Sequence, residues 1–342
     1  KNMSGIPQGA IRFNTDSQRL EFYAQGEWWV MSTDTPNLGT SDDNQPGARA
    51  IAYAGNNGSN FNDINYINMS STGNAVDFGD TAMGATTAGA MCASSTRGIY
   101  AGGQNPGVNS AEIEFITIAS TGSATDWGAN LSDGRDFLTA LGNQTRGLWA
   151  GGRITNPATG TNIIDYVTIA SSGQAANDFG DLTAAQLFYP MGLASPTRGI
   201  IGGSSPSSPG DDGIDFITIA TLGNAQDFGT LGTNRGGAGL SNATRGIFGG
   251  GYTPSLSSAI SYITIASTGD TTNFGDLTRN CRSQSPAASP IRGLFMGGKE
   301  PASSLTVDYI QIATEGDAVD FGDLLGTARG NTGGCSNAHG GL

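Results

Sequence analysis

Apolar and polar positions recur along this chain in a unit of roughly 48 residues, which occurs six times between Gly47 and the C-terminus. The most regular copy begins at Thr244-Arg245-Gly246-Ile247-Phe248 and continues, after Gly-Gly and a polar loop, with Ile260-Ser261-Tyr262-Ile263-Thr264-Ile265. The second segment places apolar side chains on both faces of a strand, so both faces must be buried. A sheet packed between two neighbouring sheets meets that condition.

Glycines divide each unit into short strands. Gly73, Gly122, Gly173, Gly223, Gly269 and Gly316 lie in turns of the Ser-Thr-Gly type, where positive φ joins two strands. Gly-Gly pairs at Gly102, Gly151, Gly202, Gly249 and Gly297 end the strand that begins at each Arg-Gly step. We expect four strands per repeat. Residues 327–335 are then left over. We predict that they pair with strands of the first repeat and so join the two ends of the repeat region.

The order of strands, Gly-Gly, turn and aromatic resembles the kelch repeat. The aromatic position is filled by Phe78, Trp127, Phe179, Phe228, Phe274 and Phe321. This resemblance runs from Gly47 onward, with a degenerate first copy, and implies an all-β fold: a six-bladed kelch-like β-propeller. It implies no activity. Asp-Phe-Gly at Asp77, Asp178, Asp227 and Asp320 is interpreted as a turn of the repeat with a buried aromatic.

Before the repeats, alternating apolar residues from Gly9 to Tyr23 and from Gln25 to Val30 predict a small β-meander. We expect the meander to span residues 1–31, a linker 32–46, and the propeller 47–342. Three strands are too few to bury a core alone. We therefore predict that the meander docks or oligomerises through Ile11, Phe13, Leu20, Phe22, Trp28 and Trp29. Adjacent strand residues face opposite sides, so either Trp28 or Trp29 is the one that faces inward.

The segment Ile11-Arg12-Phe13-Asn14-Thr15-Asp16-Ser17, followed by Leu20-Glu21-Phe22-Tyr23, looks like a module of structural proteins of tailed bacteriophages. That resemblance implies a place on the virion surface and other virion proteins as partners. It also implies self-association, which in fibre-like appendages is commonly a homotrimer.

Composition narrows the possible partners and chemistry. The formal net charge of −13 disfavours nucleic acid, and no apolar stretch suits membrane insertion. Cys92, Cys281 and Cys335 are too few for a disulfide scaffold and are expected to be free, buried thiols. With His339 as the only histidine, we expect no metal, no cofactor and no catalytic residue. The chain begins at Lys1, which is compatible with a longer precursor.

The loops after each Gly-Gly differ in length and sequence, and recognition commonly resides in such loops, although neutral drift explains the variation equally well. Phe61, Arg153, Tyr252 and Lys299 are the candidate ligand-binding residues there. The favoured function is a non-enzymatic phage appendage, a tail-fibre or head-fibre protein that binds a host-surface glycan or receptor. The alternatives are a propeller glycosidase or lyase on such an appendage, and a bacterial secreted adhesin.

Overall fold

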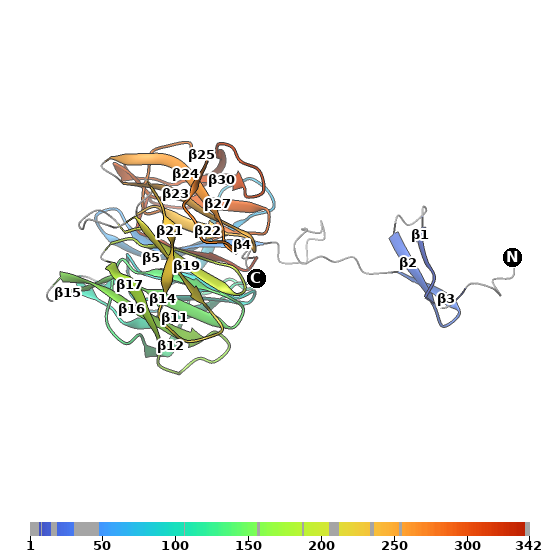
Figure 1. Ribbon diagram of the computed structural model, residues 1–342, viewed down its shortest axis with the longest axis horizontal. Helices are drawn as coiled ribbons and strands as arrows, with labels where there is room; N and C mark the ends of the chain where they lie inside the picture. Colours follow the sequence, from blue (N-terminus) through green and yellow to red (C-terminus); the bar gives the residue numbers. More distant parts are fainter. Residues whose placement is uncertain are drawn as a thin grey trace. The chain divides into compact units, whose positions relative to one another are not determined.

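The computed structural model describes residues 7, 9–14, 19–30, 48–105, 107–155, 158–186, 188–204, 212–232, 236–252 and 255–338 (Figure 1). The chain divides into two compact units, Lys1–Gln45 and Pro46–Leu342. The predicted all-β class is confirmed, because every element of the described residues is a strand.

The first unit contains three antiparallel strands in the order β1 (Ile11–Asn14), β2 (Arg19–Ala24) and β3 (Glu27–Val30). Phe22 is the central residue, since it pairs with Ile11 on one side and with Trp29 on the other. Gln25 and Gly26, both at positive φ, form the turn between β2 and β3.

The described residues of the second unit form six sheets of four main strands and two short ribbons. Sheets 2 to 6 each take four main strands that are consecutive in the chain, whereas sheet 1 takes its first strand from the C-terminal segment. Sheet 1 is β32 (Gly333–Ser336), β4 (Arg49–Asn56), β5 (Asn60–Asn68) and β6 (Val76–Asp80). Sheet 2 is β7 (Ala90–Ala93), β8 (Arg97–Ala101), β11 (Glu112–Thr117) and β12 (Thr125–Asn130). Sheet 3 is β13 (Thr139–Gly142), β14 (Arg146–Ala150), β16 (Ala158–Thr168) and β17 (Asn177–Gln186), with β15 (Arg153–Thr155) added to β16.

Sheets 4 to 6 follow the same order of first to fourth strand. Sheet 4 is β18 (Met191–Ala194), β19 (Arg198–Gly202), β20 (Gly213–Thr218) and β21 (Gln226–Thr230). Sheet 5 is β22 (Ala238–Ser241), β23 (Arg245–Tyr252), β24 (Leu256–Thr264) and β25 (Thr272–Asp276). Sheet 6 is β26 (Ser285–Ala288), β27 (Arg292–Met296), β30 (Thr306–Gln311) and β31 (Val319–Asp323). Short ribbons pair β9 (Gln104–Asn105) with β10 (Val108–Asn109), and β28 (Lys299–Glu300) with β29 (Ala302–Ser303).

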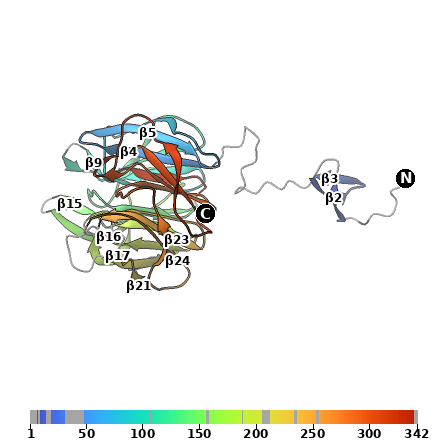
Figure 2. The same ribbon diagram turned by 90° about the horizontal axis from the view of Figure 1, so that it is seen from above.

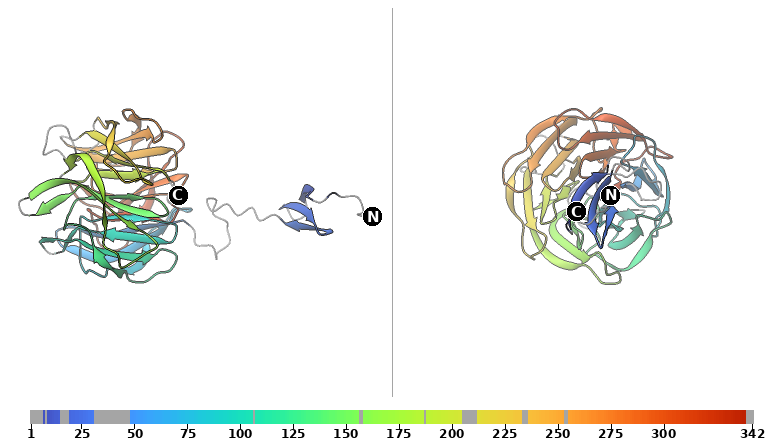
Figure 3. Two further views of the ribbon diagram at one scale, coloured as in Figure 1. Left: turned by 60° about the horizontal axis from the view of Figure 1, so that its bottom comes forward. Right: turned by 90° about the vertical axis from the view of Figure 1, so that its right-hand side faces the viewer.

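The six sheets lie around a common centre, as the right-hand view of Figure 3 shows, and we call them the ring. Their first strands lie innermost and contact one another in chain order, and the first strand of sheet 6 also contacts that of sheet 1. Apolar clusters fill the spaces between consecutive sheets; one cluster packs Ile247 and Phe274 of sheet 5 against Phe295 of sheet 6. Both faces of the third strands are therefore buried, as their apolar pattern predicts.

The predicted pairing of the C-terminal segment with the first repeat is confirmed. Cys335 of β32 lies opposite Ile51 of β4 in an antiparallel register. The strand covers Gly333–Ser336, whereas Gly330 forms a single backbone bridge with Asn56. The two ends of the unit thus share one sheet.

The arginine of each repeat joins its own sheet to the next one. Arg97, for example, lies over the Phe115 ring of its own sheet at 4.7 Å and donates a hydrogen bond of 3.1 Å to the Ile169 carbonyl of sheet 3. The same donation is made by Arg49 to Ile118, Arg146 to Ile219, Arg198 to Ile265, Arg245 to Ile312, and Arg292 to Met69. The last bond links sheet 6 to sheet 1.

The Asp-Phe-Gly segments were predicted to be turns, and this is wrong: all four lie within the fourth strands β6, β17, β21 and β31. The aromatic is buried as expected. Its carbonyl accepts a hydrogen bond from the turn glycine of the next sheet, as in Gly269 N to Phe228 O at 2.7 Å. A Cβ on Gly229 would lie 2.3 Å from the Gly269 carbonyl oxygen. Close approach between two sheets, and not a tight turn, therefore requires the glycine of this motif.

Candidate binding site at the loop end of the ring

The ring has two different ends because every sheet is antiparallel. At one end, which we call the arginine end, lie the short turns between first and second strands and between third and fourth strands. The other end, the loop end, carries the connections after each Gly-Gly and those that lead to the next sheet. The chain enters β4 at Arg49 and leaves β32 at Ser336, opposite Ala50, so both of these points lie at the arginine end. Figure 2 shows β9 and β15 at the loop end.

Six equivalent residues, each two positions before a first strand, surround the centre of the loop end; we call them the mouth residues. All six have positive φ, between 54° and 69°. They are Ala88, Phe137, Tyr189, Gly236, Ser283 and Asn331. Backbone hydrogen bonds run from one to the next, for example from Phe137 N to Ala88 O at 2.7 Å and from Asn331 N to Ser283 O at 3.1 Å. Five of the six are not glycine, so this backbone is strained at equivalent positions and is held by its neighbours.

A cavity of about 120 Å³ lies behind the mouth residues, between the six first strands. Its lining consists mostly of Ala, Gly, Leu and Met residues of those strands, with Tyr189, Ser283 and Asn331 at the mouth. The side-chain oxygens of Asn331 and Thr332 are buried there without a hydrogen-bond partner. A narrow cavity with a few unpaired oxygens suits ordered water better than a sugar ring.

Aromatic rings gather on one side of the mouth, between sheets 3 and 4. The Phe137 ring lies 4.6 Å from that of Tyr189 and 5.2 Å from that of Phe188. Arg153, a predicted ligand-binding residue, lies over the Phe137 and Phe188 rings at 4.9 and 5.4 Å. Its guanidinium is paired with the buried Asp136 carboxylate through Nε and Nη2 at 2.9 and 2.5 Å. Arg153 therefore positions the aromatic cluster, and its charge is already neutralised.

Two of the other candidates, Tyr252 and Lys299, lie on either side of Arg282. The Arg282 guanidinium lies over the Tyr252 ring at 5.3 Å, and Arg282 forms a backbone bridge with Lys299. Burial, and then the neighbouring Arg282 charge, lower the pKa of the Lys299 ammonium. The structure thus brings together two residues that are 47 positions apart in the sequence, Tyr252 and Lys299, around a third that the sequence analysis missed. Arginines outside the Arg-Gly step include Arg135, Arg153 and Arg279 as well as Arg282, so the sequence did not single Arg282 out.

Phe61, the fourth candidate, lies in β5 of sheet 1. Its half-buried ring is covered by the Arg329 guanidinium at 5.1 Å, and its backbone forms a bridge with Thr86. Arg329 in turn is paired with Asp63 at 2.5 Å. Phe61 therefore contacts the segment before β32 and the connection from sheet 1 to sheet 2, and Arg329 links it to the strand of Lys299, since Gly298 N donates to the Arg329 carbonyl at 2.9 Å.

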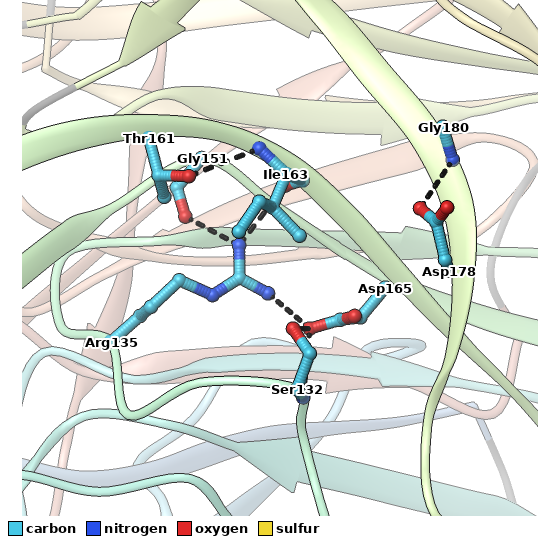
Figure 4. Close-up of polar contacts among 8 residues, drawn as sticks. All are labelled: Ser132, Arg135, Gly151, Thr161, Ile163, Asp165, Asp178 and Gly180. Atoms are coloured by element: carbon cyan, nitrogen blue, oxygen red, sulfur yellow. Dashed lines mark hydrogen bonds and ion pairs between the residues drawn. The ribbon is translucent and has the colours of Figure 1, made fainter.

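Buried carboxylates of the third strands hold the loop end in place. The sequence analysis did not identify them. Glu114, Asp165, Asp215 and Asp308 are each at most 6% exposed. Glu114, Asp165 and Asp308 accept hydrogen bonds from the connection that precedes their sheet, and Asp215 accepts them from Thr183 of β17 in the preceding sheet. Figure 4 shows Asp165 with Ser132 of that connection and with Arg135, whose Nη2 lies 2.6 Å away. Arg135 also donates to the carbonyls of Gly151 and Ile163 at 2.8 and 3.0 Å. This pair ties the connection between sheets 2 and 3 to the end of a Gly-Gly strand.

The cysteine thiols are enclosed in the second unit. Cys92, Cys281 and Cys335 are free and buried, as predicted, and burial raises the pKa of the Cys92 thiol to about 12. No three His, Cys, Asp or Glu side chains come together in a metal-binding arrangement among the residues described, and His339 lies outside them. The described part of the chain has no helix that could cross a membrane.

The meander of the first unit carries a second candidate site. Five of its six predicted docking residues share one face by strand register, namely Ile11, Phe13, Leu20, Phe22 and Trp29. The exposed fractions of Ile11, Phe13 and Trp29 are 64%, 58% and 50%. Trp28 lies on the opposite face, where Arg12 covers its ring at 4.2 Å and Tyr23 packs edge-on against it at 5.3 Å. Of the two adjacent tryptophans, Trp28 is thus the packed one and Trp29 belongs to the apolar face.

Comparison with known proteins finds no family model that matches this chain and no curated protein with significant sequence similarity to it.

Proposed function

We propose that the second unit is a six-bladed kelch-like β-propeller and that the chain is a non-enzymatic virion appendage of a tailed phage, a tail-fibre or head-fibre protein. The observation that carries this proposal is the contrast between the two ends of the ring. Each repeat uses the same arginine to join the next sheet, whereas the equivalent mouth positions carry six different residues. A constant scaffold with a variable end is typical of a module for recognition.

We propose no enzymatic activity because the arginines and carboxylates of the ring are engaged in contacts between and within sheets. Glycan-cleaving enzymes act through a pair of carboxyl groups beside the substrate, and they often use arginines to hold acidic sugars. Here the six repeat arginines each donate to a backbone carbonyl of the next sheet, and the carboxylates Glu114, Asp165 and Asp308 are buried under loop connections. Binding without turnover is therefore the simpler function.

The apolar face of the meander supports a role in assembly. Ile11, Phe13, Leu20, Phe22 and Trp29 form a continuous patch on one face of a three-stranded sheet, and water contact with such a patch is unfavourable. We propose that other copies of the chain cover it in a homotrimer on the virion. Three weak binding sites would then add through avidity on a repetitive host surface.

Binding to host cells tests the function. The purified full-length chain is expected to bind cells and to release no reducing sugar from their polysaccharides. Release of sugar that is abolished by one carboxylate substitution would overturn the non-enzymatic proposal.

Light scattering tests the assembly. The parent chain is expected to have three times the mass of one chain, and removal of residues 1–46 is expected to give monomers. The double variant Ile11→Ser/Phe13→Ser, matched with Asn14→Ser on the opposite face, separates loss of the apolar face from loss of the segment. A parent that is monomeric in solution and on the particle would contradict the trimer.

A further inference from the structure

Arg282 and Lys299 differ from the other cations of the second unit. The chain has 16 Lys and Arg residues, and Lys299 is the sole lysine apart from Lys1. Every other arginine described between residues 48 and 338 donates a side-chain hydrogen bond to a carbonyl or a carboxylate. Within that described part, neither Arg282 nor Lys299 has an ion pair or a side-chain hydrogen bond, so their charges are available to a ligand.

The fold holds these two cations together. Backbone bonds of 3.2 and 2.9 Å join Arg282 to Lys299 in both directions. Both side chains are half-buried, and the Lys299 chain runs against Gly330, where an added Cβ would lie 2.7 Å from Cγ of Lys299. Two like charges held side by side repel each other, and partial burial weakens the screening by water. A bound anion would remove this repulsion.

The neighbouring groups indicate what kind of anion fits. Tyr252, under the Arg282 guanidinium, is 37% exposed, and the Tyr189 phenol is close enough for the Arg282 charge to act on its pKa, which burial raises. A tyrosine ring offers an apolar surface to the C–H face of a sugar, and a guanidinium binds a carboxylate or sulfate through two parallel hydrogen bonds. The protein as a whole has a net charge of −13, which repels densely charged polymers such as nucleic acids.

We propose that Arg282 and Lys299, with Tyr252, bind a single acidic sugar, a uronate or a sulfated residue, within an otherwise weakly charged host glycan. This inference rests on the proposed glycan-binding function and names the ligand class of the loop end. The site lies beside the mouth residue Ser283, whereas the neutralised Arg153 and its aromatic cluster lie between sheets 3 and 4.

The test uses the full chain with two matched pairs of probes: oligogalacturonate and its methyl ester, and a sulfated galactan oligomer and its desulfated form. The site variant is R282Q/K299Q. Its control is S70D/S120D, which changes the net charge by the same amount on exposed turn residues of the arginine end. Thermal melting confirms that both variants fold, and titration calorimetry measures binding.

The chain is expected to bind at least one acidic probe and to bind its neutral counterpart about tenfold or more weakly. R282Q/K299Q is expected to lose that preference, and S70D/S120D is expected to keep it. Equal binding of acidic and neutral probes, or a preference that R282Q/K299Q retains, would overturn the inference. If the chain binds host cells but none of the acidic probes, the inference fails and the glycan-binding function stands; if it does not bind host cells, the proposed function itself fails.

Discussion

The two ends of the ring differ in how faithfully they repeat. At the arginine end, six arginines make the same contact to the next sheet, and the contact from Arg292 to Met69 has the same form as the contacts inside the chain. At the loop end, the six mouth residues share one backbone conformation, yet their side chains range from Gly236 to Tyr189. The backbone thus repeats at both ends, while side chains repeat only where they join sheets.

This difference separates scaffold from candidate site without any comparison between species. A residue type that recurs in every repeat serves a need that every repeat has, which is attachment to its neighbour. Arg282 forms no ion pair and no side-chain hydrogen bond with the described residues, so it does not serve that shared need.

Truncation after Leu325 should have the largest effect. It removes β32, leaves β4 with one partner strand instead of two, and removes the contacts of β32 with the first strands of sheets 2 and 6. The edge of β4 would be exposed at the centre of the ring, so we expect a large fall in the melting temperature and loss of a single cooperative transition. Circular dichroism measures both, and a truncated chain that melts like the parent would contradict closure by this strand.

Substitution of Arg135 should separate buried pairs from exposed cations. Arg135→Met leaves the Asp165 carboxylate buried and unpaired, so we expect the free energy of unfolding to fall by about 3–5 kcal/mol. Arg282→Met removes a cation that pairs with no carboxylate among the described residues. It should change the free energy of unfolding by about 1 kcal/mol or less. Denaturant titration measures both variants. Equal losses would show that the loop end is scaffold throughout.

Two glycines of one contact should respond differently to alanine. Gly229 and Gly269 have almost the same φ, 152° and 153°, so both variants carry a similar backbone strain. A Cβ on Gly229 would lie 2.3 Å from the Gly269 carbonyl oxygen, whereas nothing lies within 4 Å of a Cβ on Gly269. Gly229→Ala should therefore be clearly the less stable variant in denaturant titration. Equal stability would mean that the sheets do not approach each other closely there.

Glu114→Gln should have the smallest effect, visible in the pH dependence of stability. Burial raises the pKa of Glu114 in the folded protein, so the native state binds the proton more tightly than the unfolded state. The parent should therefore lose stability relative to the variant as the pH rises from the unfolded carboxyl pKa through the raised folded value. The Gln side-chain oxygen can still accept from Ala82 N and Met83 N. Parallel stability curves from pH 4 to 8 would contradict a raised pKa.

Much of the fold was predictable because the same apolar and glycine positions recur in each repeat. The apolar pattern around Tyr262, the turn glycines and the leftover C-terminal segment predicted the all-β class and the pairing of β32 with β4. The Asp-Phe-Gly prediction failed because glycine also occurs where two sheets approach closely, and one sequence does not distinguish this from a turn. Arg282 was missed because its partners Tyr252 and Lys299 come from different connections, and only the fold brings them together.

Hydrogen–deuterium exchange of the full chain, with and without bound host-cell polysaccharide, tests the division between the two ends most directly. Exchange should slow on binding at the loop end, above all in residues 251–259 and 299–306, which contain Tyr252 and Lys299. The arginine-end turns, such as residues 118–124 and 265–271, should exchange at unchanged rates. Protection confined to those turns, with no change at the loop end, would contradict ligand binding at the loop end.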